Sequence, residues 1–175
     1  MATSHDWSTD VFAVIKKFGI ETVCTVPDGG LTRLLNMVGD DPAVRLITLS
    51  TEEESCGIVT GQWLGGKRAM VAMQSSGVGN CINALGYPAI MRAPFPMLVT
   101  MRGQWGEFNP WQVQMGRSCE AVLEAIGVKC FPVDKPEEVG ETFAVRAFRF
   151  EVLGRKHAQI VQLRITRPEE DAKPS

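Results

Sequence analysis

Short apolar segments alternate with amphipathic ones along most of the chain, and this alternation limits the possible folds more than any other feature of the sequence. The apolar segments carry few charges, which is typical of strands whose two faces are both buried. Six strands are expected, at residues 21–26, 44–49, 68–73, 97–101, 129–133 and 159–164. Since helical segments separate them, the alternation predicts a doubly wound α/β fold: a six-stranded, mainly parallel sheet with helices on both faces.

The helical segments are predicted from apolar residues that recur every three or four positions. The first contains Trp7, Val11 and Phe18 and ends at Gly19, which is typical of a helix C-terminus. Further helices are expected at 31–38, from about 52, from about 80, at 118–126 and at 136–153. We predict one domain over residues 1–167, followed by a polar tail at 168–175.

Composition excludes several classes of function. The 18 basic and 20 acidic residues give a net charge of -2 without a basic run, so neither nucleic acid nor an anionic membrane is an expected partner. Five widely spaced cysteines indicate reduced thiols and a cytoplasmic protein. With two histidines and no Cys-x-x-Cys, no metal site made by this chain alone is expected. No apolar window is long enough to predict a signal peptide or a membrane span.

Ligands of such sheets bind beyond the carboxyl ends of the strands, near the point where the strand order reverses. Four connections at predicted strand ends are therefore candidates for a site: residues 27–30, 50–54, 74–80 and 102–111. The second and third contain the most unusual combinations of side chains.

Three consecutive acids follow the second predicted strand. Glu53 and Glu54 can form capping boxes with Ser50 and Thr51, and acids are favoured in the first turn of a helix. Capping alone therefore explains two of the acids. Glu52 is left without a structural role at a strand end, and it is the candidate functional acid.

The segment from Gln74 to Asn80 reads Gln-Ser-Ser-Gly-Val-Gly-Asn and follows the third predicted strand. It is expected to form a glycine loop that opens a helix, where free backbone N–H groups attract anions. The segment lacks the Gly-Lys-Ser/Thr of a phosphate-binding loop and the full Gly-x-Gly-x-x-Gly pattern. A tight structural turn and a contact with an anion or a cofactor both remain open.

The segment from Arg102 to Trp111 combines three aromatic residues with an arginine and a glutamate. Such a loop exposes more aromatic surface than a solvated connection usually does. The aromatic residues are expected to pack on a neighbouring subunit, and Arg102 is a candidate ligand of an anionic substrate group. The two interpretations are compatible.

Four of these features, in this order and spacing, resemble the pyrimidine-binding domain of thiamine diphosphate enzymes. They are Pro27-Asp28, Glu52 nine residues before Gly61, the Gln74–Asn80 segment, and Arg102-Gly103. The chain is most similar to the alpha subunit of sulfopyruvate decarboxylase and to the corresponding half of phosphonopyruvate decarboxylase, over residues 7–164.

The resemblance implies a role for each of these residues. Glu52 is implied to hydrogen-bond N1′ of the aminopyrimidine, with Glu53 as the alternative in a register shifted by one residue. Gly79 and Arg102 are implied to bind the substrate. The implied contacts of the cofactor are Pro27, Asp28, Gln74, Ser76, Gly77 and Asn80.

The resemblance also implies a reaction and a partner. The expected reaction is release of carbon dioxide from a small anionic 2-keto acid; carboligation by the same half-enzyme and a non-catalytic scaffold are the alternatives. The chain has no Gly-Asp-Gly followed by Asn, the motif that holds Mg²⁺ and the diphosphate in complete members. A beta subunit is therefore implied to supply this motif. Contacts between copies of this chain in a homodimer are expected as well. Thr51 stands where many relatives have histidine, which puts chemistry that needs that histidine in doubt.

Overall fold

The computed structural model describes residues 7–104, 106–131, 142–145, 148–156 and 159–166. The chain divides into two compact units. One unit is Gly19–Cys130, and the other combines Met1–Phe18 with Phe131–Ser175. All the candidate site residues belong to the first unit.

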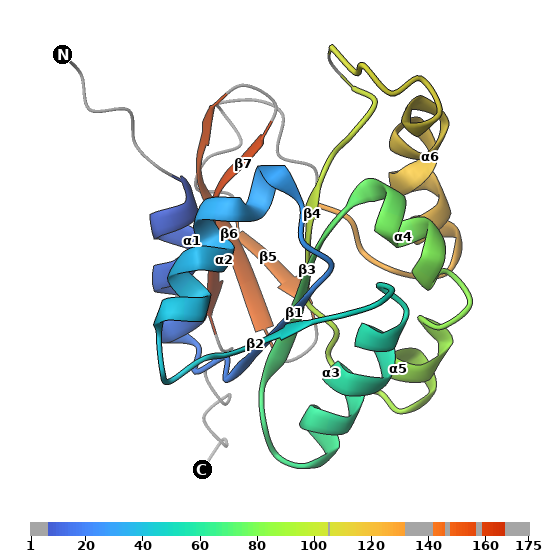
Figure 1. Cartoon of the computed structure of the whole chain (residues 1–175). Helices are drawn as coiled ribbons and strands as arrows, with labels where there is room; N and C mark the ends of the chain where they lie inside the picture. The colour runs from blue at the N-terminus through green and yellow to red at the C-terminus, as the bar shows by residue number, and fades with distance from the viewer. Residues whose placement is uncertain (1–6, 105, 132–141, 146–147, 157–158, 167–175) are drawn as a thin grey trace, which may run out of the picture. The chain divides into compact units, whose positions relative to one another are not determined.

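A four-stranded parallel sheet forms the centre of the Gly19–Cys130 unit (Figure 1). Its strands lie in the order β2-β1-β3-β4, and every neighbouring pair is parallel. All four residues of β1 and the first five of β3 are buried, as expected for strands covered on both faces. The predicted α/β class is therefore confirmed. The strands are β1 (Thr22–Thr25), β2 (Arg45–Thr48), β3 (Ala69–Gln74) and β4 (Met97–Thr100).

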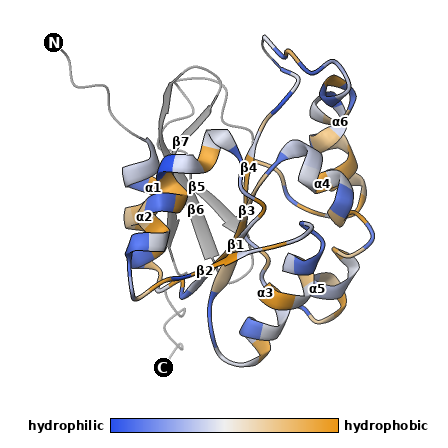
Figure 2. Ribbon diagram, viewed as in Figure 1, coloured by the Kyte–Doolittle hydropathy of each residue, from blue (hydrophilic) through white to orange (hydrophobic). Residues whose placement is uncertain are grey.

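Helices cover both faces of this sheet. Figure 1 shows α2 on one face and α3, α4, α5 and α6 on the other. The strands are mainly apolar in Figure 2, and the core between sheet and helices includes Met73 of β3, Val59 of α3 and Leu123 of α6. The helical elements are η1 (Gly29–Leu31), α2 (Thr32–Asp40), α3 (Glu54–Leu64), α4 (Ser75–Cys81), α5 (Gly86–Ile90) and α6 (Gln112–Ala125).

The strand order reverses between β1 and β3. From β1 the chain crosses to β2 at one edge, and it then returns past β1 to form β3. The residues that follow the two central strands, Asp28 after β1 and Ser75 after β3, therefore lie at the switch point where ligands of such sheets bind.

The other unit holds a helix and an antiparallel sheet. The helix is α1 (Trp7–Lys17), which confirms the first predicted helix. The sheet has the order β5-β6-β7, and both pairs are antiparallel. Its strands are β5 (Thr142–Val145), β6 (Phe148–Lys156) and β7 (Gln159–Thr166).

Several predictions for the end of the chain were wrong. Residues 142–145 and 148–153 are strands, not part of a helix at 136–153, and residues 129–131 are not in a strand. The strand predicted at 159–164 is present as β7, but it pairs antiparallel with β6, so the parallel sheet has four strands in the described part of the chain, where six were predicted. Three predicted parts lie outside the described residues: the end of the predicted strand at 132–133, the start of the predicted helix at 136–141, and the tail at 168–175.

The sequence itself contained the signal for β6. Phe148, Phe150 and Val152 alternate with Arg149 and Glu151. This alternation has a period of two, which is typical of a strand and does not fit the spacing of an amphipathic helix.

Candidate active site

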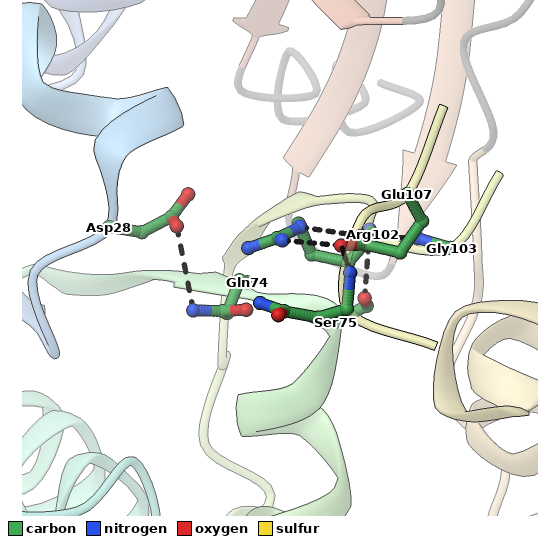
Figure 3. A network of polar contacts seen from close by, with 7 residues as sticks. Asp28, Gln74, Ser75, Arg102, Gly103 and Glu107 are labelled. Carbon is green, nitrogen blue, oxygen red and sulfur yellow. Dashed lines mark hydrogen bonds and ion pairs between the residues drawn. The ribbon is translucent and has the colours of Figure 1, made fainter. Parts of the chain in front are cut away.

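Asp28 follows β1, and its carboxylate accepts hydrogen bonds from its own connection and from the ends of β3 and β4. Oδ2 accepts from Gly30 N at 3.2 Å and from Thr100 Oγ1 at 3.0 Å. Gln74 Nε2 donates to Oδ1 at 3.4 Å (Figure 3). The other amide atom of Gln74, Oε1, is buried and has no hydrogen-bond partner in the described part of the chain. Because buried acceptors normally have a donor, this oxygen marks a place where a ligand N–H or O–H would fit.

Glu52 lies two residues before α3 and is buried, with 6 % of its surface exposed. Asn80 Nδ2 donates a hydrogen bond to Glu52 Oε2 at 2.8 Å. For the second oxygen, Oε1, the described residues provide no recorded hydrogen bond. Glu53, the alternative in the shifted register, is exposed. Of the two neighbouring acids, only Glu52 therefore faces the residues at the start of α4.

The side chain of Glu52 fits against the backbone of Gly77. A Cβ atom added at Gly77 would lie 2.5 Å from both Cγ and Oε1 of Glu52, closer than real Cβ contacts ever are. A larger residue at position 77 would therefore force the Glu52 side chain out of its observed position.

The start of α3 differs from the predicted capping boxes. The helix begins at Glu54, and its N-cap residue Glu53 makes no capping hydrogen bond through its side chain. Glu54 instead accepts a hydrogen bond from Ser50 N at 3.0 Å through Oε2. Glu54 thus satisfies a backbone N–H before the helix. Of the three consecutive acids, capping therefore explains only Glu54.

The predicted glycine loop is itself helical. Residues 75–81 form α4, which begins at Ser75 directly after β3 and not at about Asn80. Gly77 and Asn80 lie three positions apart on this helix, and residues at that spacing share a helix face. Both can therefore contact Glu52 at once.

Arg102 follows β4 and forms an ion pair with Glu107. Its Nε donates to Glu107 Oε2 at 2.8 Å, and its Nη2 donates to Oε1 at 2.7 Å. Glu107 also accepts hydrogen bonds from the backbone N–H groups of Gly103 and Asn109, at 3.1 and 2.9 Å. The hydrogen bonds from Arg102 are the main reason why the pKa of Glu107 is lowered to about 2, and they raise the pKa of Arg102.

The predicted site residues therefore fall into three groups. Glu52, Gly77 and Asn80 form one, Asp28 and Gln74 form a second, and Arg102 joins Glu107 in a third. Ser76 of α4 is half-buried. Pro27 and Gly79 are exposed, and a Cβ at Gly79 would meet Met115 Sδ at 3.2 Å.

Sequence reasoning missed Thr100, Ser75 and Glu107. Thr100 ends β4 and Ser75 begins α4, so the rule that functional groups collect at carboxyl ends of strands could have pointed to both. For Glu107 the only signal was an acid close to Arg102 in a loop, which does not predict a bidentate pair.

The five cysteines are free thiols, as predicted. Cys56 on α3 and Cys81 at the end of α4 are fully buried, and a hydrogen bond between their side chains lowers the pKa of Cys56 and raises that of Cys81. Burial raises the pKa of Cys24 to about 11. Burial places these three thiols in the core of the unit.

The described residues contain no group of three or more histidine, cysteine, aspartate or glutamate residues that could hold a metal ion. None of the helices seen in them has the length and apolar character needed to cross a membrane.

Comparison with known proteins identifies the family. Residues 6–107 match the thiamine pyrophosphate enzyme family, in the part described as the N-terminal TPP binding domain. The chain belongs to this family of thiamine diphosphate enzymes. It is 35% identical over 141 residues to the sulfopyruvate decarboxylase subunit alpha of Methanothermobacter thermautotrophicus, which covers 78% of this chain and 86% of that protein.

Two further relatives have related names. The sulfopyruvate decarboxylase subunit alpha of Methanococcus maripaludis is 33% identical over 132 residues, which is 75% of this chain and 79% of that protein. The phosphonopyruvate decarboxylase of Streptomyces viridochromogenes is 34% identical over 142 residues, which is 78% of this chain but only 35% of that longer protein.

Proposed function

We propose that this chain is the alpha subunit of a thiamine diphosphate-dependent decarboxylase. Its substrate is 3-sulfopyruvate or phosphonopyruvate, and its products are carbon dioxide and the corresponding aldehyde. The names of the relatives support this reaction, because proteins called sulfopyruvate and phosphonopyruvate decarboxylase align with about three quarters of the chain. The observation that carries the proposal is the buried carboxylate of Glu52, which contacts Asn80 and Gly77 of α4, the helix that follows the central strand β3.

The side chains of this site fit an aminopyrimidine. Such a ring offers a nitrogen that can share a proton with a carboxylate and an amino group that can donate to an oxygen. Glu52 Oε1 lacks a recorded hydrogen bond within the described ranges, and Gln74 Oε1 is a buried acceptor without a donor. We infer that the cofactor is held by Pro27, Asp28, Gln74, Ser76, Gly77 and Asn80. When bound, thiamine diphosphate would accept the electron pair released as carbon dioxide leaves.

Each residue has a defined task in this proposal. Glu52 shares a proton with N1′ of the aminopyrimidine, and a buried acid is well suited to that role because little water competes for its oxygen. Asn80 fixes the orientation of the Glu52 carboxylate through the 2.8 Å hydrogen bond. Arg102 and Gly79 bind the anionic tail of the substrate, since a guanidinium matches the geometry of a sulfonate or phosphonate.

Magnesium and the diphosphate require a partner. A metal that bridges to a diphosphate needs oxygen ligands, and the described residues offer no cluster of acids for it. We propose that a beta subunit supplies these ligands, as the "subunit alpha" names of the relatives suggest. Phe108 and Trp111 are 81% and 69% exposed, which supports a further contact between copies of the chain. The five free thiols favour a reducing compartment, the cytoplasm.

The test is co-expression with a candidate beta subunit, followed by measurement of carbon dioxide release from pyruvate, 3-sulfopyruvate and phosphonopyruvate. We expect release from one of the two anionic-tail substrates, dependent on both thiamine diphosphate and Mg²⁺. Release from pyruvate alone would remove the argument for an anionic tail. No cofactor-dependent release from any of the three would contradict the decarboxylase and favour a scaffold.

A further inference from the structure

The Glu107 carboxylate accepts four hydrogen bonds from the protein, although it lies in a loop. Four donors converge on it: Nε and Nη2 of Arg102 and the backbone N–H groups of Gly103 and Asn109, at 2.7 to 3.1 Å (Figure 3). Its side chain is only 5% exposed, and that of Arg102 is 23% exposed. A nearly buried carboxylate with four donors is held in one orientation, so its partner Arg102 is held with it.

The backbone of Arg102 is fixed independently of its side chain. Arg102 N donates to Ser75 Oγ at 3.0 Å, which ties the end of β4 to the start of α4. Gly103 has a φ of +75°, and a Cβ there would lie 2.6 Å from Val113 Cα. The loop therefore approaches α6 too closely for any other residue at position 103. Both ends of the Arg102 side chain are thus constrained.

A guanidinium can bind two anions at once because its donors lie along different edges. Glu107 occupies the Nε–Nη2 edge of Arg102. Figure 3 shows the remaining nitrogen directed away from Glu107, toward the side where Asp28 and Gln74 lie. The Phe108 ring stacks near the guanidinium, with 5.5 Å between Arg102 Cζ and the ring centroid, which further restricts its rotation.

We propose that Glu107 is a positioning residue: it holds Arg102 so that the second edge of the guanidinium faces the site and receives the sulfonate or phosphonate tail of the substrate. This inference rests on the proposed function. Glu107 itself does not contact the substrate. Glu107 would lower the entropic cost of substrate binding. An arginine that is already oriented loses less side-chain freedom when an anion binds.

The alternative is that Glu107 only stabilises the loop. The two roles differ in which substrates they affect. A positioning role concerns the charged tail alone, so loss of Glu107 should weaken the binding of a substrate with a tail and leave pyruvate unaffected. A purely structural role would affect all 2-keto acids to a similar extent.

The experiment compares Glu107→Gln, Glu107→Asp and Arg102→Gln with the wild type, each purified in complex with the beta subunit. Glu124→Gln on the exposed part of α6 is the matched control, since it removes the same charge. Sulfoacetate, which has the tail but no keto group, is titrated by calorimetry. In parallel, KM and kcat are measured for the anionic-tail substrate and for any turnover of pyruvate.

We expect Glu107→Gln to raise the Kd of sulfoacetate and the KM of the anionic-tail substrate about tenfold, the equivalent of one lost hydrogen bond to a charged group. The kcat should change little, Glu107→Asp should recover part of the affinity, and Glu124→Gln should match the wild type. Unchanged or tighter binding of sulfoacetate by Glu107→Gln would overturn the proposal, as would equal losses for pyruvate. The calorimetry remains decisive even if the complex decarboxylates none of the substrates, an outcome that contradicts the proposed reaction alone.

Discussion

Glu52 and Glu107 are both nearly buried acids of the Gly19–Cys130 unit, yet their surroundings differ. Glu107 accepts four hydrogen bonds, which is about the full capacity of a carboxylate. Glu52 accepts one from Asn80, and its other oxygen lies against Gly77. A saturated carboxylate has no lone pair left for a ligand, whereas Glu52 has. Burial therefore does not distinguish these two acids, but the number of donors does.

The most severe test of this comparison is Glu52→Gln. Glutamine has the same shape and can still accept the hydrogen bond from Asn80, so the fold should be retained. It cannot carry the proton at N1′, and we expect kcat to fall by about 10²- to 10⁴-fold, the range of general acid–base contributions. Carbon dioxide release by the complex and a thermal unfolding curve of the same sample measure both effects. A kcat within about tenfold of the wild type would place the reactive acid elsewhere.

Gly77→Ala tests the steric side of the Glu52 environment. The added methyl group overlaps Glu52, so we expect a loss of about 1–3 kcal/mol in the free energy of unfolding, as for other overpacked sites, together with reduced turnover. Gly57→Ala in α3 is the control, because a Cβ there meets nothing within 4 Å. That change should stabilise the helix by up to about 1 kcal/mol. Urea unfolding should thus move the two variants in opposite directions, and a parallel shift would refute the clash.

Asn80→Ala removes the hydrogen bond that the described residues provide to the Glu52 carboxylate. We expect kcat to fall about tenfold, because a carboxylate that is free to rotate spends less time in the productive orientation. The exposed Asn83, shortly after α4, is the control position. Steady-state kinetics at increasing thiamine diphosphate concentrations separate the two possible roles of Asn80. A change confined to cofactor affinity would indicate that Asn80 acts on the cofactor and not on Glu52.

The smallest effect concerns the acid stability of Glu107. Its pKa is about 2 in the folded chain and 4.5 as a free group. Because the folded pKa is the lower one, the ionised carboxylate stabilises the fold fully above pH 4.5, and this contribution is lost as the pH falls toward 2. The difference in unfolding free energy between wild type and Glu107→Gln should therefore shrink across this window. Urea unfolding at a series of pH values measures it, and a constant difference would show that the ion pair does not stabilise the fold.

The two units also differ in how well their structure could be predicted from the sequence. In the Gly19–Cys130 unit, each strand contains a short apolar run, and all four were predicted within two residues of their observed ends. In the C-terminal segment, Phe148 to Val152 alternates in polarity, yet this region was assigned to a helix. Alternation over a few residues is easily overlooked inside a longer stretch that also fits a helical spacing.

The site could be predicted in part. Position at strand ends selected the connections that contain Glu52, Asp28 and Gln74, because parallel strands bring their carboxyl ends to one edge. The capping argument then singled out Glu52, and the resemblance singled out Asp28 and Gln74. The contact between Asn80 and Glu52 was not predictable, since it depends on α4 beginning at Ser75 directly after the strand. The pairing of Arg102 with Glu107 depends on a loop conformation that includes a positive φ at Gly103, and side-chain geometry of this kind leaves no spacing rule in the sequence.

The close approach of Glu52 to Gly77 has a consequence for the history of the family. An alanine at position 77 is sterically compatible with a shorter side chain at position 52, whereas a glutamate there would have to move from its observed position. The two positions are therefore expected to change in order: a lineage can replace Glu52 first and then accept a larger residue at 77 without a clash. A relative with a side chain at the equivalent of position 77 should thus have a shorter residue, or a displaced glutamate, at the equivalent of position 52.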